Sequence, residues 1–227
     1  MKRFFVLLSF LVLAIFSYSQ ELSYVTFSGG TTFSSFSFTT DQQIIIKISD
    51  DGKVLEWGNQ QEAGRYYGTP GKLQPYMGRV DYYGTEADSI LKGKIKSIGT
   101  CNITYYGASE TAEKAGKINS LGRTSLDYYS IYDNIAFRGK IKFAGNTLFS
   151  YYSNYDNEAF VGKLKSVANT TLTYYSNFDD KLIKGKIKSI GSFNYAWYSS
   201  FDSRMFQGGL KSGTLFQNVN GVVYTIM

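Results

Sequence analysis

The sequence predicts an all-β fold, an antiparallel meander of tandem 23-residue β-hairpin repeats in a curled sheet. Apolar and polar residues alternate with a period of two within each copy, which favours strands over helices. A glycine opens each regular copy, at Gly93, Gly116, Gly139, Gly162, Gly185 and Gly208. An aromatic pair keeps the same step, at Tyr82-Tyr83, Tyr105-Tyr106, Tyr128-Tyr129, Tyr151-Tyr152, Tyr174-Tyr175 and Trp197-Tyr198.

Residues 1–19 have the composition of a secretory signal peptide: two cations, a short apolar run and small residues at the end. Because the apolar run is too short for a good membrane anchor, we expect export and no transmembrane helix in the mature chain. Cleavage after Ser19 would leave Gln20 as the first residue. Loss of Lys2 and Arg3 would lower the formal net charge from +6 to +4.

Residues 20–51 read as strands that lack the repeat. Two turn signals, Gly29-Gly30 and Asp51-Gly52, divide and close this segment. Terminal units of repeat proteins differ from the others because one of their sides has no neighbour. We therefore predict an N-terminal β cap that covers the first repeat.

Residues 52–227 form the predicted repeat domain, divergent over 52–92 and regular over 93–227. Both prolines of the chain, Pro70 and Pro75, fall in the divergent part, where loops tolerate what a regular strand ladder rejects. No Pro/Ser-rich linker interrupts the chain, so one domain of about 200 residues is expected.

The alternation also predicts a register. The turn of the third regular copy would pair Phe143 with Phe149 on the buried face, and a tight turn at 156–159 would pair Tyr155 with Phe160. An apolar face along about a dozen strands must be covered. The sheet could do this as an open spiral, a barrel or a two-layer sandwich, and strand twist makes it curl in each case.

The opposite face carries lysine and tyrosine in alternation, with Tyr152 expected across from Lys140 and Lys163. As a binding surface it would contact acidic glycans, with tyrosine rings stacking on sugars and lysines pairing with anionic groups. The other interpretation is a solvated face whose lysines protect the strands from aggregation. The candidate ligand residues are Lys94, Lys117, Lys140, Lys163, Lys186, Tyr106, Tyr129, Tyr152 and Tyr175.

Composition argues against catalysis, metals and cofactors. The chain has no histidine and one cysteine, Cys101, which excludes most triads, thiolate clusters and internal disulfides. Cys101 is interpreted as a free thiol with no base to activate it. The recurring acids are interpreted as turn residues that cap their own backbone rather than as metal ligands, at Asp133, Asp156, Asp179 and Asp202.

The motifs GKIKSIG…ITYY and LTYYSNFDD…GKIKSIG resemble the tandem repeats of uncharacterised secreted bacterial proteins, over roughly Gly52 to Met227. That resemblance implies secretion and a repeat fold, and no activity. The run YDNEAFVGKLKSV is also weakly similar to the tyrosine–aspartate repeats of Rhs-type shell proteins.

These features predict an exported, non-enzymatic envelope or cell-surface module. Its expected partners are anionic envelope polysaccharide or another surface protein. Export argues against nucleic acid, although lysine with aromatic residues is also the chemistry of single-strand binding platforms. The alternative is an outer-membrane β-barrel whose Phe/Ile/Tyr face meets lipid.

Overall fold

The computed structural model describes residues 20–60 and 72–227, and in these residues the chain is all-β, as predicted. Twenty strands form three sheets. The expected signal peptide and Pro70 lie outside the described residues.

The first sheet has seven strands, in the order β19-β20-β1-β2-β3-β4-β5. Its neighbouring strands are antiparallel except β1 and β20, which are parallel and join the two ends of the described chain. The strands are β1 (Glu21–Ser28), β2 (Thr32–Thr39), β3 (Ile44–Ile48), β4 (Val54–Gln60), β5 (Leu73–Pro75), β19 (Phe216–Val219) and β20 (Val222–Ile226).

The second sheet is the predicted meander, with eleven strands in sequence order from β6 to β16. A short two-stranded sheet, β17 (Ala196–Trp197) with β18 (Leu210–Ser212), continues it. The eleven strands are β6 (Val80–Tyr82), β7 (Ile95–Ile98), β8 (Cys101–Tyr105), β9 (Ile118–Leu121), β10 (Thr124–Tyr128), β11 (Ile141–Ala144), β12 (Thr147–Tyr151), β13 (Leu164–Val167), β14 (Thr170–Tyr174), β15 (Ile187–Ile190) and β16 (Phe193–Asn194).

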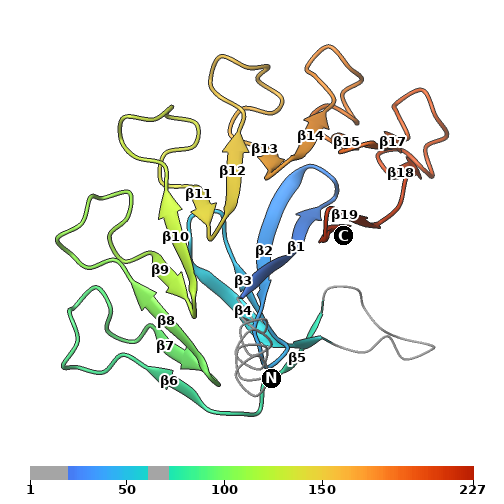
Figure 1. Ribbon diagram of the computed structural model, residues 1–227. Coiled ribbons are helices and arrows are strands. Elements are labelled where there is room, and N and C mark those ends of the chain that lie inside the picture. Colours follow the sequence, from blue (N-terminus) through green and yellow to red (C-terminus); the bar gives the residue numbers. More distant parts are fainter. Residues whose placement is uncertain (1–19, 61–71) are drawn as a thin grey trace, which may run out of the picture.

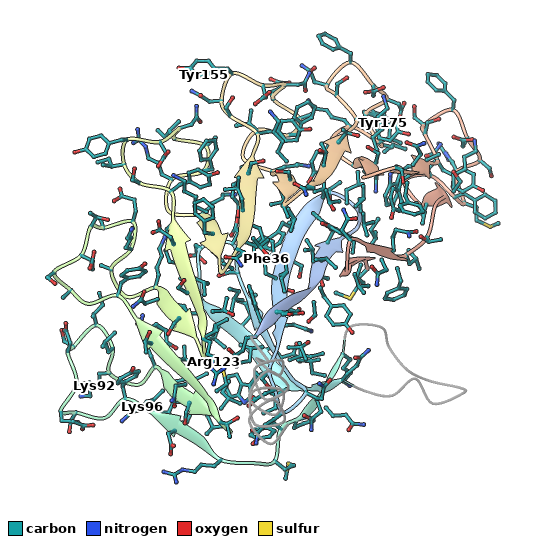
Figure 2. All side chains as sticks on the ribbon, in the orientation of Figure 1. Phe36, Lys92, Lys96, Arg123, Tyr155 and Tyr175 are labelled. Carbon is teal, nitrogen blue, oxygen red and sulfur yellow. The ribbon has the colours of Figure 1, made fainter. Side chains whose placement is uncertain are left out.

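The meander bends into an arc, and β1 to β4 lie inside it while the long hairpin loops project outward (Figure 1). Each sheet ends on two different strands, so none closes on itself. The buried side chains of both sheets form one core cluster. Phe36 of β2, labelled in Figure 2, contacts Phe149 of β12 with ring centroids 4.5 Å apart.

The N-terminal segment that was predicted to cover the first repeat contacts it, since the Thr100 N–H donates to the Gln42 side chain at 3.1 Å, and it also reaches later repeats. The strands of residues 20–51 run along the inside of the arc, because the apolar face of every hairpin needs cover. Gly30 lies so close to Trp197 that a Cβ there would be 2.2 Å from the indole ring. Gly52 lies equally close to Tyr128, where the distance to the hydroxyl would be 2.0 Å.

The predicted register of the third hairpin is wrong by one residue, because its turn has two residues and not three, and each copy also contains a β-bulge. Phe143 pairs with Leu148 across a two-residue turn. On its other side β11 pairs Phe143 with Asp127 and Ile141 with Tyr128, so Lys142 is an extra residue. A bulge reverses the side-chain alternation beyond it. Phe143 is therefore exposed and Ala144 is buried. The same shift recurs in the other hairpins of the arc.

The predicted tight turn at 156–159 is instead the middle of a longer loop, residues 153–161. The ladder stops at Tyr152, whose N–H donates to the Lys163 carbonyl at 2.9 Å and whose carbonyl accepts from Gly162 at 2.8 Å. Beyond that pair, Tyr155 does not meet Phe160 and is 90 % exposed. Equivalent loops follow the aromatic pair in each copy, and they are the outward projections of Figure 1.

Candidate functional site

The structure places the five predicted ligand lysines at the boundaries between hairpins, half-buried. The Lys140 ammonium group donates to the carbonyl oxygen of Gly162 in the next copy at 2.8 Å, and Lys163 does the same to Gly185 at 2.6 Å. The equivalent bonds join Lys117 to Gly139 and Lys94 to Gly116, whereas Lys186 donates to the carbonyl oxygen of Gly29 in the turn after β1.

Each of these ammonium groups also lies over an aromatic ring of the core, at 4.3 Å for Trp197 and 5.0–5.3 Å for the tyrosines. Burial lowers the pKa of four of the five lysines, because removal from water disfavours the charged form. Those four are Lys94, Lys117, Lys163 and Lys186.

The four predicted ligand tyrosines make contacts of the same kind. The Tyr152 hydroxyl donates to the carbonyl oxygen of Leu172, in the next copy, at 2.8 Å. The other three repeat that bond at 2.8–2.9 Å, from Tyr106 to Leu126, from Tyr129 to Phe149 and from Tyr175 to Tyr195. Burial raises the pKa of all four hydroxyls.

Turns between the N-terminal strands cover part of the row formed by these lysines and tyrosines. Lys140 forms an ion pair with Asp50 at 2.8 Å. The ammonium group of Lys163 donates to the Thr31 carbonyl at 2.9 Å. The predicted face is thus one connected row, and its polar groups join the copies to one another and to the inner sheet.

The structure also shows a second group of candidate binding residues, which was not predicted from the sequence. Four aromatic side chains at the tips of consecutive loops are almost fully exposed, with exposed fractions from 90 to 96 %. We call this set the tip row: Tyr132, Tyr155, Phe178 and Phe201. Its signal in the sequence is a third aromatic residue with the 23-residue step, three positions after the aromatic pair. Tyr155 stands at the outer edge of the molecule in Figure 2.

A clamp of two side chains fixes the loop backbone at each tip residue. In the loop of Tyr155, one carboxylate oxygen of Asp156 accepts from the Ser153 N–H at 2.7 Å and from its hydroxyl at 2.8 Å. The Ser153 hydroxyl oxygen accepts from the Tyr155 N–H at 3.3 Å. These hydrogen bonds lower the pKa of Asp156. The same three bonds recur in the loops of Tyr132, Phe178 and Phe201.

The prediction that the recurring aspartates cap their own backbone is therefore confirmed. The clamps use both backbone and side-chain donors of the serine, so the loop keeps its shape without burying the aromatic ring.

Hydrogen bonds also join neighbouring loops. The Asn154 N–H donates to the Asn134 side-chain oxygen at 3.2 Å, and the two side chains bond to each other. Asn157 and Asn177 repeat this pair of bonds, with 3.0 Å from the Asn177 N–H. In the last loop the Ser200 N–H donates to Asp180 at 3.0 Å. These hydrogen bonds keep consecutive loops next to each other, so neighbouring tip residues are one repeat apart.

The first two loops of the arc lack the clamp and the aromatic tip. Gly84 and Gly107 stand where the later loops have the clamp serine, and Glu86 and Ser109 stand at the tip position. The tip row is consequently confined to the last four loops.

In the described part of the chain, no group of three or more His, Cys, Asp or Glu side chains is placed to hold a metal ion. Cys101 is buried at the start of β8, and burial raises the pKa of its thiol to about 11. No helix among the described residues is long and apolar enough to cross a membrane.

Comparison with known proteins leaves the site to be interpreted from its own geometry: no protein-family model, no curated protein and no solved structure matches this chain.

Proposed function

We propose that the protein is an exported, non-enzymatic interaction module of the cell envelope or surface, and that its contact surface is the tip row. One observation carries this proposal: four consecutive loops with the same clamp each leave an aromatic side chain almost fully exposed. A single exposed aromatic side chain needs no explanation. Four at the same position of consecutive repeats form a regular series, and we interpret that series as a contact surface.

The lysine–tyrosine row is less suited to that role. A ligand on it would have to displace hydrogen bonds such as Lys163 to Gly185 and Tyr152 to Leu172. Each displaced bond leaves a half-buried carbonyl oxygen without its partner, which costs roughly 1–3 kcal/mol. The tip rings have no such bonds to lose.

The remaining parts of the proposal have support in the chain itself. The composition of residues 1–19 supports export. The absence of histidine from the sequence and the high thiol pKa of Cys101 support a role without covalent or acid–base catalysis.

The test is co-sedimentation of the purified mature chain with isolated cell envelopes. We expect the wild type to sediment, and the fourfold variant Y132S/Y155S/F178S/F201S to remain in the supernatant with unchanged circular dichroism. Met77, which is 91 % exposed and lies outside the tip row, supplies the matched control M77S. Equal sedimentation of the wild type and the fourfold variant, or none by the wild type, would contradict the proposal.

A further inference from the structure

We infer that the tip row binds an uncharged polysaccharide chain that lies along the loop edge, with one sugar ring stacked on each tip residue. This inference rests on the proposed function and names the chemistry of its partner. Aromatic rings offer a flat apolar face at a small entropic cost, because they have only two side-chain torsions. The CH face of a pyranose ring is the matching surface on a sugar.

The spacing of the rings favours a polymer. The tip residues recur once per repeat, and the hydrogen bonds between neighbouring loops keep them in series. A partner with the same chemical group at regular intervals can engage all four rings, and each contact raises the effective concentration for the next. A compact partner would use only one or two of them.

The surroundings of the rings favour a hydroxylated partner over an apolar one. None of the four tip rings touches another aromatic ring within the described residues. The residue before the ring is polar in three loops, Asn154, Asn177 and Ser200, and in the first loop it is the half-exposed Ile131. Separate rings with amide and hydroxyl groups between them match sugars, which alternate apolar faces with hydroxyl groups.

The charge of the loops argues against an anionic partner. The four loop segments 130–138, 153–161, 176–184 and 199–207 contain six acidic and four basic residues. Lys184 and Glu158 form an ion pair within these segments at 3.2 Å, and Asp202 pairs with Lys211 outside them at 3.0 Å, so the excess of acid is small. An excess of acid repels polyanions and anionic lipid headgroups alike.

The curved shape of the loop edge argues against a membrane as the partner of the tip row. The loops spread along the outer, convex side of the arc (Figure 1). A flat bilayer would reach only part of such an edge, whereas a flexible polymer chain can follow it.

The inference can be tested by titration calorimetry of the mature protein with four uncharged polysaccharides: hydroxyethyl cellulose, arabinoxylan, galactomannan and dextran. Carboxymethyl cellulose serves as the anionic counterpart of the first, and vesicles of phosphatidylcholine with phosphatidylglycerol test the membrane. We expect saturable binding to at least one uncharged polymer, with the same affinity at low and high salt.

Variants of the tip row locate the contact. Each single serine replacement should weaken binding about threefold to tenfold, the size of one exposed aromatic contact. The fourfold variant should lose more than about thirtyfold, because the contacts act in series. The ring-conserving variants Y155F and F178Y, and the control M77S, should bind like the wild type.

Binding only to carboxymethyl cellulose with loss in salt, binding only to vesicles, or no binding to any polymer would overturn the inference. So would equal binding by the fourfold variant. If the polymers fail while envelope co-sedimentation still depends on the tip row, the proposed function stands and the polysaccharide assignment falls. If both fail, both are rejected.

Discussion

The Lys140 ammonium group lies 2.8 Å from the Asp50 carboxylate, and the carbonyl oxygen of Asp50 accepts the Ile141 N–H at 2.7 Å. The turn after β3 is thereby fixed to the edge of β11. Lys140 also donates to Gly162, so one side chain connects the inner sheet with two successive copies of the repeat.

Replacing Lys140 tests whether this row is structural. K140Q should lower the free energy of unfolding by about 1–3 kcal/mol, because it removes charge-assisted hydrogen bonds from a half-buried site. Lys165 is the matched control: it is exposed, and its ammonium group lies 5.2 Å from the centroid of the Tyr152 ring. K165Q should cost less than about 1 kcal/mol. Urea unfolding measures both, and equal stability of the two variants would show that Lys140 is a solvated side chain.

Two glycines with nearly the same φ allow the cost of backbone strain to be measured apart from the cost of a packing clash. Gly52 has a φ of +79° and Gly93 a φ of +78°, so alanine would be in the left-handed region at either position. A Cβ at Gly93 would meet nothing within 4 Å, whereas one at Gly52 would be 2.0 Å from the Tyr128 hydroxyl.

We therefore expect G93A to cost about 1–2 kcal/mol, the left-handed penalty alone. G52A should cost about 1–3 kcal/mol more, because Tyr128 is buried and must move. Urea unfolding of G52A and G93A measures the difference. Similar unfolding midpoints for the two variants would mean that the turn at Gly52 does not pack against Tyr128 as described.

Alkaline pH should unfold the protein. Burial raises the pKa of Tyr105 and of Tyr224 to about 12, and it raises the pKa of Tyr128, Tyr151 and Tyr174 as well. Above pH about 10 the unfolded chain loses these protons while the folded chain keeps them. The unfolded state then binds fewer protons, so the free energy of unfolding falls as pH rises.

The lysines with lowered pKa values act in the opposite direction just below pH about 10.4, since the unfolded chain holds their protons longer. The tyrosines are more numerous and their shifts are larger, so the net effect above pH 10 is loss of stability. Thermal unfolding between pH 8 and 12, followed together with tyrosinate absorbance, measures both effects. A melting temperature that stays constant up to pH 12 would contradict this prediction.

Cys101 should react with thiol reagents only when the first hairpins open. Its thiol is buried and its pKa is raised to about 11, so little thiolate exists at neutral pH. In the native protein we expect labelling at least about a hundredfold slower than in urea, with a rate set by local opening. Mass spectrometry of the alkylated protein gives both rates. Labelling at the same speed in both conditions would place the thiol at the surface.

The fold class and the repeat step could be predicted from the sequence because both depend on local pattern. Strand propensity, the 23-residue step and the turn residues each act within a few residues of chain. The aspartate caps were predictable for the same reason: Asp156 bonds to Ser153, three residues away. The 23-residue spacing of the tip row is also visible in the sequence. Spacing alone, however, does not distinguish an exposed aromatic residue from a buried one, so exposure had to come from the structure.

What the tertiary structure alone decided depends on contacts between segments far apart in the chain. One bulged residue per copy exposes Phe143 and buries Ala144, and alternation cannot show where it falls. The lysines were expected on a solvated face, yet Lys163 binds Thr31 from 132 residues away. Pattern reveals which faces of a strand are apolar or charged. Which segment covers each face is decided by packing, because every apolar face and every buried polar group must find a partner in the same compact space.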